Sequence, residues 1–350
     1  MVKIGVAGAT GYMGAELLRL LVVHPKVRVS VVMASERSAG VPVGRLIPSL
    51  RGILPLTVEA LDSERLAQET ECALLALPHG ETHHVVSVLR RRGRRVVDLS
   101  ADYRLRSAAD FETWYKTPHG DPGGLREAVY GLPELHRKDI AGCHLVANPG
   151  CYPAGAVLAV LPLLRAGLGR PDGIVVDSKS GVTGAGAQTH RPDPAYQYAE
   201  LNEDLWAYGV AKHRHTPEIE QELSGVVGAP VRVTFTPHLV PINRGIFTTA
   251  YVPLARDVSA GDCLAVYRED YADEPFVRVL DEGEVPRLRA VVGSNYCDVS
   301  VAVDRRTGRA ICMSALDNLG KGGSAQAVQN LNIMHGWDER AGLEAPPVYP

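Results

Sequence analysis

The sequence lacks the features that mark metal-binding, membrane-spanning and nucleic-acid-binding proteins. Its six cysteines form no C-x-x-C pair and no Cys/His spacing of a zinc site. No apolar run approaches the ~20 residues that cross a bilayer. The 37 Lys and Arg against 40 Asp and Glu leave a net charge of −3, so no global attraction to nucleic acid or anionic lipid arises. We therefore expect no metal, no membrane and no nucleic-acid partner.

No pattern of a secretory leader and no internal repeat is visible, so we expect neither. Met1 leads directly into an apolar strand pattern, and unpatterned cysteines without a leader are typical of a reducing compartment. We therefore expect a cytoplasmic protein. The 350 residues favour about two domains, and 45% hydrophobic with 22% charged residues is ordinary for a globular chain.

The N-terminus has the order strand, glycine turn, helix. Residues 2–7 form an apolar strand pattern, residues 8–14 read GATGYMG, and apolar residues recur at helical spacing from Met13 to Leu21. This order opens a Rossmann unit, in which a dinucleotide pyrophosphate lies at the helix N-terminus. Glycines serve there for the turn, the close approach of the pyrophosphate and helix–strand packing. The residues expected to bind a dinucleotide are Gly8, Thr10, Gly11, Tyr12, Met13 and Gly14.

The end of the next strand pattern, residues 27–34, bears on the choice of cofactor. NAD sites usually place a carboxylate here for the ribose 2′-hydroxyl. This chain instead offers Ser35, Arg37 and Ser38, whose hydroxyls and guanidinium suit a 2′-phosphate, although Glu36 lies among them. The alternative is that Arg37 is a surface loop residue. We predict NADP(H) as the cofactor.

Two further strand patterns end in candidate site residues. Residues 73–77 run into Pro78 and His79, and residues 96–99 run into the segment from Ser100 to Arg104. In open α/β sheets ligands collect at the carboxyl ends of strands. We expect Pro78 and His79 to line the cofactor, with a purely structural loop histidine as the alternative.

Cys151 is the most informative residue of the chain. It lies in the run NPGCYP, residues 148–153, between an apolar strand pattern and a helical pattern. Pro153 favours a first helical turn, so the thiol is expected at a helix N-terminus. There the helix dipole and free N–H groups favour a thiolate and are able to hold an oxyanion. We predict that Cys151 is a nucleophile, against the alternative of a small buried hydrophobe.

A second candidate group lies in the run KHRHTPEIE, residues 212–220. Thr216 is predicted as a helix N-cap and Pro217 as the first helical residue, which places His215 just before the helix. A neutral histidine within reach of Cys151 is able to take the thiol proton and return one later. A lone histidine is more often structural, but this run holds two histidines, an arginine and Glu218 close together.

The second half of the chain carries the patterns of a mostly antiparallel sheet with helices. Residues 231–235, 245–251 and 310–315 have the β-branched and aromatic content of strands. A glycine-rich stretch, residues 181–186, follows another strand pattern, and it indicates either close approach to a ligand or a mobile loop.

These motifs together resemble the N-acetyl-gamma-glutamyl-phosphate reductases, NADPH-dependent enzymes of arginine biosynthesis in the semialdehyde dehydrogenase group. The resemblance covers essentially the whole chain, through GATGYMG, LPHG, DLSADYR, YGLPE, NPGCYP, KSGVTGAG, HRHTPEI and the closing DNL. It implies an α/β fold of the semialdehyde dehydrogenase type. An N-terminal Rossmann domain would span residues 1–150, with a C-terminal helix of about 318–350 packed back on it, and an α+β catalytic and oligomerisation domain would span 151–317.

The resemblance also implies a mechanism. Cys151 would attack an acyl phosphate to form a thioester, hydride from NADPH would reduce it, and His215 would act as base and acid, oriented by Glu218. The further cofactor contacts it implies are Ser180, Gly181 and Asn318, the last at the nicotinamide carboxamide. The expected substrate contacts are Ser100, Arg104, Asn148 and Arg214. A homo-oligomer, either dimer or tetramer, is expected as well.

Three other interpretations fit parts of the sequence. A short-chain dehydrogenase would share the glycine spacing and use Tyr208 with Lys212 as its Y-x-x-x-K pair. An NADP-sensing regulator without catalytic activity would need the glycine turn but not Cys151 with His215. A reductase of carrier-protein-bound aminoadipyl phosphate, from lysine biosynthesis, would differ by one substrate methylene, worth only about 1–3 kcal/mol in a pocket.

Overall fold

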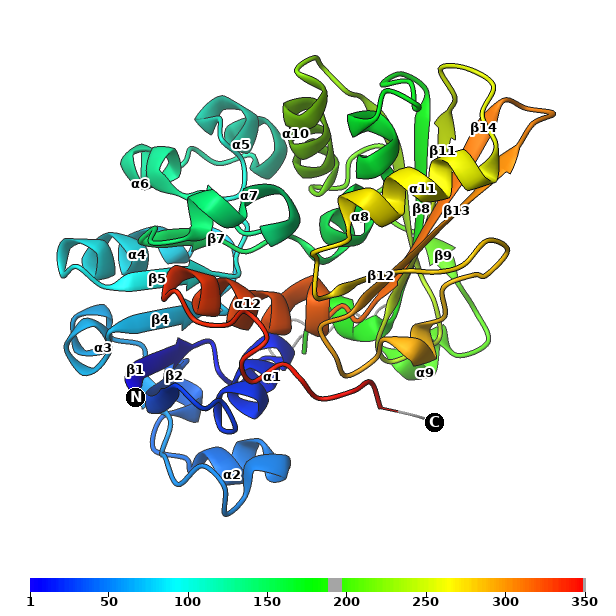
Figure 1. The fold of residues 1–350 in the computed structure, drawn as a ribbon. Helices are drawn as coiled ribbons and strands as arrows, with labels where there is room; N and C mark the ends of the chain where they lie inside the picture. The colour runs from blue at the N-terminus through cyan, green and yellow to red at the C-terminus, as the bar shows by residue number, and fades with distance from the viewer. Residues whose placement is uncertain (188–196, 349–350) are drawn as a thin grey trace. The chain divides into compact units, whose positions relative to one another are not determined.

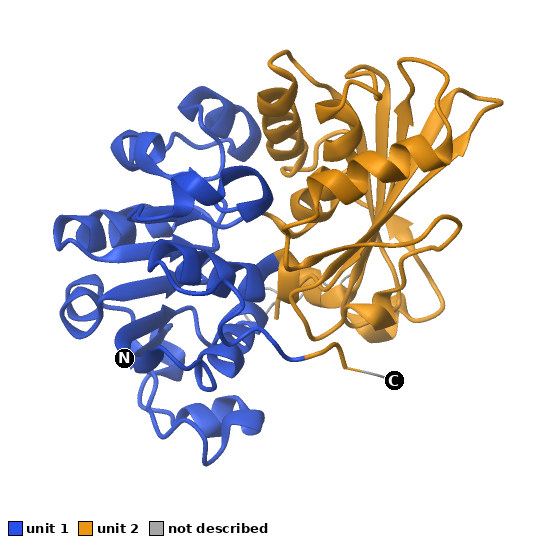
Figure 2. Cartoon of the chain, in the orientation of Figure 1, with its two compact units in different colours: residues 1–149, 323–345 blue, residues 150–322, 346–350 orange. Residues whose placement is uncertain are grey.

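The structure is a computed structural model that describes residues 1–187 and 197–348 (Figure 1). The chain divides into two compact units (Figure 2). Unit 1 comprises residues 1–149 and 323–345, and unit 2 comprises residues 150–322 and 346–350. Residues 349–350, the end of the segment assigned to the C-terminal helix, lie outside the described residues. Within the described part of the chain, no helix has both the length and the apolar character that crossing a membrane requires.

The described strands of unit 1 form one parallel, seven-stranded sheet in the order β3-β2-β1-β4-β5-β7-β6. The strands are β1 (Val2–Ala7), β2 (Val27–Ala34), β3 (Glu59–Ala60), β4 (Cys72–Leu75), β5 (Arg95–Asp98), β6 (Val129–Tyr130) and β7 (Leu145–Ala147). The central strand β4 and the strand β7 are buried throughout, as continuous apolar runs in a parallel sheet covered on both faces should be. This topology confirms the predicted Rossmann fold.

Seven described α-helices of unit 1 lie between these strands in the chain, and an eighth, α12, comes from near the C-terminus (Figure 1). They are α1 (Tyr12–Leu21), α2 (Val43–Leu46), α3 (Ser63–Glu69), α4 (Thr82–Arg91), α5 (Ala108–Tyr115), α6 (Pro122–Glu127), α7 (Pro133–Ile140) and α12 (Ala325–Met334). Asp62 and Ser107 cap α3 and α5 by accepting backbone N–H groups with their side chains. The arginine-rich run 90–95 ends α4 and opens β5.

Helix α12 belongs to unit 1 although it lies near the end of the chain. It packs against α1, α7 and β5, and Ser324 just before it donates to the carbonyl of Met13. All ten residues of α12 are buried, including amides such as Asn330, which donates to the carbonyl of Gly131. The regular helix is therefore shorter than the 318–350 segment of the sequence analysis, and residues 318–322 fall in unit 2.

Unit 2 is built on a mixed sheet whose described strands run in the order β12-β13-β14-β11-β8-β10-β9. These are β8 (Ile174–Ser180), β9 (Trp206–Ala207), β10 (Val233–Leu239), β11 (Ile246–Pro253), β12 (Val277–Val279), β13 (Cys297–Asp304) and β14 (Arg309–Leu316). The pairs β8–β10 and β12–β13 are parallel and the other described pairs antiparallel, as expected for a mostly antiparallel sheet.

Four described α-helices accompany this sheet (Figure 1). They are α8 (Cys151–Arg165), α9 (Tyr198–Leu201), α10 (Thr216–Val227) and α11 (Ala260–Asp270). Helix α8 is buried from Tyr152 to Leu164 and packs against β11, β14, α10 and α11. It is the core helix of unit 2, so its first residue has a fixed position.

Two positions of the glycine turn between β1 and α1 lie so close to other backbone atoms that they have no room for a side chain. Gly8 has φ +78, and a Cβ on it would lie 2.1 Å from the carbonyl oxygen of Ala76. A Cβ on Gly14 would lie 2.3 Å from the carbonyl oxygen of Gly8. At Gly11, by contrast, a Cβ would meet only that same oxygen, at 3.6 Å. Gly8 and Gly14 are therefore needed for packing, whereas Gly11 faces open space.

We expect Gly14→Ala to lower the free energy of unfolding by about 1–3 kcal/mol, because the new methyl overlaps backbone atoms that cannot move aside. Gly11→Ala, three residues earlier, is the matched control and should cost less than about 1 kcal/mol. Denaturant unfolding of both variants measures the difference. Equal losses would contradict this account of the turn.

Candidate active site

Cys151 is the first residue of helix α8. Strand β7 ends at Ala147, and Gly150 is the extended N-cap residue with φ −66 and ψ 152. The first backbone N–H groups of a helix have no partner within the helix, and the dipole there favours negative charge. The Cys151 thiol is partly exposed, unlike Cys72, Cys263, Cys297 and Cys312, which are buried. The setting is the one that activates a cysteine.

Glu218 contacts the peptide group that precedes Cys151. It lies in the first turn of α10, is only 1% exposed, and its Oε1 accepts the backbone N–H of Gly150 at 2.6 Å. A hydrogen bond to a buried carboxylate is charge-assisted and strong. The sequence analysis expected Glu218 to orient His215. The contact with Gly150 was not foreseen, because residues 68 positions apart meet only through the packing of α10 on α8.

The imidazole of His215 lies directly against Gly150. A Cβ on Gly150 would come within 2.6 Å of Nε2 and 2.8 Å of Cε1 of this ring. The structure therefore brings His215 to the residue before Cys151, and it does so because position 150 carries no side chain. His215, and not Thr216 as predicted, is the N-cap of α10. The helix starts one residue earlier because a proline is tolerated anywhere in the first turn, here as its second residue.

Aromatic rings pack around His213, which in turn packs against His215. The centroid of His213 lies 4.9 Å from that of His215, and Tyr152 and Phe235 lie 5.6 and 5.3 Å from His213. Nδ1 of His213 accepts the backbone N–H of His215 at 3.2 Å. Burial, assisted by the charge of Arg214, lowers the pKa of His213 to about 4. His213 is thus a neutral hydrogen-bond acceptor at physiological pH.

The sequence analysis missed these ring residues as part of the site. Tyr152 could have been predicted as a site residue because it follows Cys151 in the chain. Phe235 could not, because it is far from both Cys151 and His215 in the sequence. The hydroxyl of Tyr208, considered as half of a Y-x-x-x-K pair, lies 2.8 Å from the hydroxyl of Tyr152. Its position beside the cysteine-bearing helix disfavours the short-chain dehydrogenase interpretation.

The predicted residues after β8 and β14 meet elsewhere in unit 2. Asn318 accepts the N–H of Gly245 at 2.7 Å and donates to the Thr183 hydroxyl at 2.9 Å, so its amide ties the 181–186 loop to β11. Ser180 is buried at the end of β8, and a Cβ on Gly181 would lie 2.7 Å from the carbonyl oxygen of Asn243. The glycine-rich loop is therefore closely packed at its first residue.

The predicted cofactor residues of unit 1 lie at the ends of neighbouring strands. The glycine turn follows β1, Ser35 and Arg37 follow β2, and Pro78 and His79 follow β4. The sheet order β2-β1-β4 places these three carboxyl ends side by side. Ser35, Arg37, Pro78 and His79 are exposed, and Ser38 is half-buried. The predicted dinucleotide-binding residues of unit 1 thus lie together at the carboxyl ends of three neighbouring strands.

The predicted substrate residues of unit 1 are held by backbone and side-chain hydrogen bonds. Arg104 is 8% exposed and donates from Nε to the Asn148 carbonyl and from Nη2 to the Leu99 carbonyl, both at 2.8 Å. The Asn148 amide donates to the carbonyl of Gly323, and the Ser100 hydroxyl lies 2.6 Å from a carboxylate oxygen of Asp98. In unit 2, by contrast, Arg214 is exposed next to His215.

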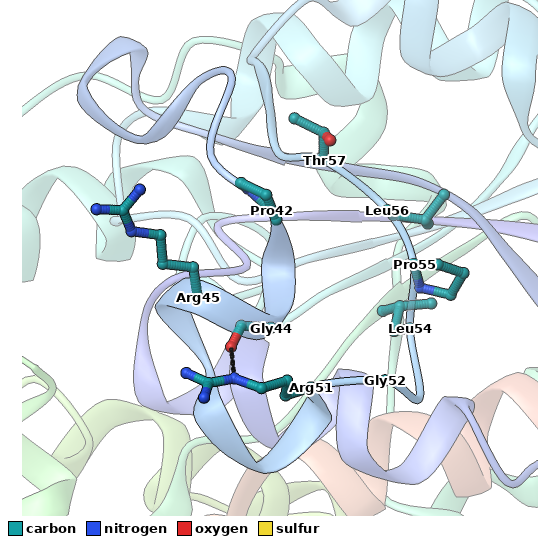
Figure 3. A pocket seen from close by; sticks show the side chains of 9 residues that line it. All are labelled: Pro42, Gly44, Arg45, Arg51, Gly52, Leu54, Pro55, Leu56 and Thr57. Carbon is teal, nitrogen blue, oxygen red and sulfur yellow. Dashed lines mark hydrogen bonds between the residues drawn. The ribbon is translucent and has the colours of Figure 1, made fainter.

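A pocket in unit 1 contains none of the predicted site residues. It has a volume of about 570 Å³ and is lined by nine residues between positions 42 and 57, among them Pro42, Leu54 and Pro55 (Figure 3). Arg51 donates to the carbonyl of Gly44 at 3.4 Å on one wall. Among the residues that the structure describes, no group of three or more His, Cys, Asp or Glu is placed to hold a metal ion.

Comparison with known proteins places this geometry in a family. The model of the semialdehyde dehydrogenase NAD-binding domain matches residues 3–143, and that of the semialdehyde dehydrogenase dimerisation domain matches residues 151–318. The N-acetyl-gamma-glutamyl-phosphate reductase of Geobacter metallireducens is 50% identical over the full length of both chains. The chain belongs to this semialdehyde dehydrogenase family. The reductase of the same name from Moorella thermoacetica is 49% identical, also over both full lengths.

Solved structures of the semialdehyde dehydrogenase family share the fold. Aspartate semialdehyde dehydrogenase II from Vibrio cholerae has a TM-score of 0.73 at 18% identity, with 96% of this chain and 98% of that chain covered. The Candida albicans enzyme, solved with NADP, has a TM-score of 0.70 at 15% identity, with 96% and 99% covered. The family resemblance stated from the sequence motifs is confirmed.

We expect selective alkylation of Cys151 by iodoacetamide at pH 7.5, because the other thiols are buried or held protonated. Burial raises the pKa of four of them, to about 11 for Cys143 and Cys263 and about 12 for Cys72 and Cys312. Only a thiolate reacts at an appreciable rate. Mass spectrometry after brief treatment should show one adduct, on the Cys151 peptide. Cys151→Ser is the control, and comparable labelling of Cys143 would contradict the prediction.

Proposed function

We propose that this chain reduces N-acetyl-glutamyl 5-phosphate to N-acetyl-glutamate 5-semialdehyde and phosphate with NADPH, in arginine biosynthesis. The observation that carries the proposal is a thiol at a helix N-terminus whose preceding residue is covered by the imidazole of His215. The proposal is also supported by the relatives named N-acetyl-gamma-glutamyl-phosphate reductase, to which this chain is about 50% identical over its full length. The chain is thus a phosphorylating semialdehyde dehydrogenase.

Acyl transfer to the enzyme is the first step. The sulfur of Cys151 attacks the acyl carbon, the carbon–oxygen bond to phosphate breaks, and a thioester forms. His215 takes the thiol proton and passes it to the departing phosphate oxygen. The N–H groups at the start of α8 stabilise the oxyanion of the tetrahedral intermediate. Glu218 keeps this helix start in place through the Gly150 N–H.

The residues present fit a dinucleotide cofactor. Gly11 leaves open space above the start of α1, where backbone N–H groups favour a pyrophosphate, and Arg37 supplies an exposed cation for a 2′-phosphate. When bound, NADPH supplies the hydride that reduces the thioester carbon. The N–H groups of α8 then hold the resulting oxygen anion until Cys151 departs as thiolate and the aldehyde is released.

The remaining site residues keep proposed roles. Ser180, Gly181 and Asn318 are proposed for the cofactor, and Ser100, Arg104, Asn148 and Arg214 for the substrate. Arg214 is the strongest of the substrate candidates, because it is an exposed residue that precedes His215 in the chain and arginine binds phosphate bidentately. The dimerisation-domain match over residues 151–318 supports a homo-oligomer, dimer or tetramer. Six cysteines without a disulfide support a reducing, cytoplasmic location.

The alternatives have less support. A non-catalytic regulator would not need the packing of His215 on the residue before Cys151. An aminoadipyl phosphate reductase would use the same residues, and only the names of the relatives favour the shorter substrate. Assay of both substrates in parallel separates these possibilities.

We expect the purified protein to form NADPH from N-acetyl-glutamate semialdehyde, NADP⁺ and phosphate, and to depend on phosphate. Cys151→Ser should lower kcat about 10⁴-fold or more, since loss of a nucleophile removes the covalent route. Absorbance of NADPH follows the reaction. A folded, NADP-binding protein that turns over only the aminoadipate analogue, or neither substrate, would refute the assignment.

We expect Gly150→Ala to lower kcat about 100-fold or more with little change in KM. The new methyl would lie 2.6 Å from Nε2 of His215 and push the base aside, and base catalysis is worth about 10²–10⁴. The matched control is Gly261→Ala on α11, where the nearest atom lies 3.7 Å away. Activity of Gly150→Ala close to wild type would show that His215 does not act from this position.

A further inference from the structure

A chain of hydrogen bonds in unit 1 joins two carboxylates that are fully buried. Asp98 ends β5, and Asp102 follows four residues later. Oδ2 of Asp98 lies 2.6 Å from the Ser100 hydroxyl, which lies 3.1 Å from the hydroxyl of Thr82. The Thr82 hydroxyl in turn lies 2.7 Å from Oδ2 of Asp102. Three short contacts therefore connect one carboxylate to the other.

The number of protons shared along this chain of hydrogen bonds decides the total charge of its two carboxyl groups. Each of the three contacts needs one proton, and the two hydroxyls supply two. With both carboxylates ionised, one oxygen–oxygen contact would have no proton, and two negative charges would be buried together. A third proton on one carboxyl group completes the chain. The carboxyl then donates to the nearer hydroxyl, that hydroxyl donates to the next, and the last donates to the remaining carboxylate.

The surroundings place this proton on Asp98. Asp102 accepts three donors, the N–H groups of Gly80 at 2.7 Å and Thr82 at 3.2 Å and the Thr82 hydroxyl, and such bonds favour the ionised form. Among the described residues, the hydrogen bonds to the Asp98 carboxylate come from Ser100, through its N–H at 3.0 Å and its hydroxyl. Burial, with the charge of Asp102, raises the pKa of Asp98 to about 7.

We infer that Asp98 is protonated at pH 6 and that its proton completes the hydrogen-bond chain through Ser100 and Thr82 to Asp102, the residue that holds the loop after β4. Asp98 and Asp102 are then positioning residues for Pro78 and His79. The inference rests on the proposed function, because the cofactor role assigned to this loop is what makes its position important. The ligand that the loop would position is the dinucleotide NADP(H).

Other titratable groups surround the chain from neighbouring elements. Arg104 favours ionised Asp98, whereas Asp102 opposes it. Nε2 of His83 on α4 lies 3.7 Å from Asp102 Oδ2, and Nε2 of His119 lies 2.6 Å from the Asp102 carbonyl. Tyr103 and Asp121, which share a hydrogen bond, complete the set.

The direction of the pH effect follows from the raised pKa of Asp98. In the unfolded chain an aspartate ionises near pH 4, so stability from the protonated form is complete below that pH and is lost as pH rises through about 7. Above that pH the contact between Ser100 and Thr82 loses its proton. The loop that Asp102 holds should then loosen and NADP⁺ should bind more weakly.

Two amide substitutions test the position of the proton. In Asp98→Asn the side-chain amide donates to Ser100 where the carboxylic acid did, and its oxygen still accepts the Ser100 N–H. In Asp102→Asn the amide NH₂ must face either the Gly80 N–H or the two donors of Thr82. Asp98→Asn should therefore melt like wild type at pH 6 and above wild type at pH 8.5, whereas Asp102→Asn should melt lower at both.

Infrared spectroscopy detects the proton without any cofactor. The difference spectrum of wild type minus Asp98→Asn at pH 6 should contain the carbonyl stretch of a protonated carboxylic acid, and this band should vanish at pH 8.5. A missing band, or an Asp98→Asn variant as unstable as Asp102→Asn, would overturn the placement of the proton.

Cofactor binding tests the positioning role. From pH 6 to 8.5, NADP⁺ binding to wild type should weaken roughly tenfold more than binding to Asp98→Asn, about the value of one hydrogen bond. Because wild type and Asp98→Asn bind the same cofactor, ionisation of the cofactor's own phosphate affects both binding profiles equally and cancels in their ratio. If the infrared band is present but the NADP⁺ affinities of wild type and Asp98→Asn change equally with pH, the positioning role is overturned and the protonation of Asp98 stands. Absence of NADP⁺ binding by wild type at every pH would instead refute the proposed function, and the infrared result would still decide the proton.

Discussion

The hydrogen bond between Glu218 Oε1 and the Gly150 N–H, 2.6 Å long, joins the start of α10 to the start of α8. Both helix starts carry a candidate catalytic residue, His215 on one and Cys151 on the other. Because Gly150 has no side chain, the imidazole is able to approach its Cα directly. A single buried carboxylate and a single missing methyl group thus bring the candidate base next to the residue before the candidate nucleophile, 64 positions away in the chain. The His213 ring packs against His215 without adding a charge, since burial keeps His213 neutral.

Buried polar groups serve the same purpose in unit 1. Helix α12 buries Gln326, Gln329, Asn330 and Asn332, and these amides bind backbone carbonyls and neighbouring side chains and do not face water. Asp102 holds the loop after β4 by accepting its N–H groups. Buried polar networks fix one arrangement because any other leaves donors or acceptors unsatisfied. Both units therefore use hydrogen bonds between distant segments to position loops at the ends of their strands.

Local patterns were sufficient for most of the fold. The strands at 2–7 and 27–34 have the predicted bounds, and α8 starts at Cys151 as the NPGCYP run indicates. Differences occur where the pattern permits more than one solution. Proline is compatible with either of the first two helical positions, so the start of α10 was placed one residue late. The apolar stripe of α12 did not reveal that the polar residues between are buried as well, because their partners come from other parts of unit 1.

The sequence by itself determined the Rossmann opening, the family, the nucleophile candidate and its place at a helix start, because each rests on residues that are neighbours in the chain. Only the tertiary structure decided that Glu218 binds the Gly150 N–H, that rings from β10 and α8 enclose the histidines, and that Asp98 and Asp102 are joined through Thr82. These contacts connect segments far apart in the sequence. Their geometry follows from helix and sheet packing, and no local pattern of residue types encodes it.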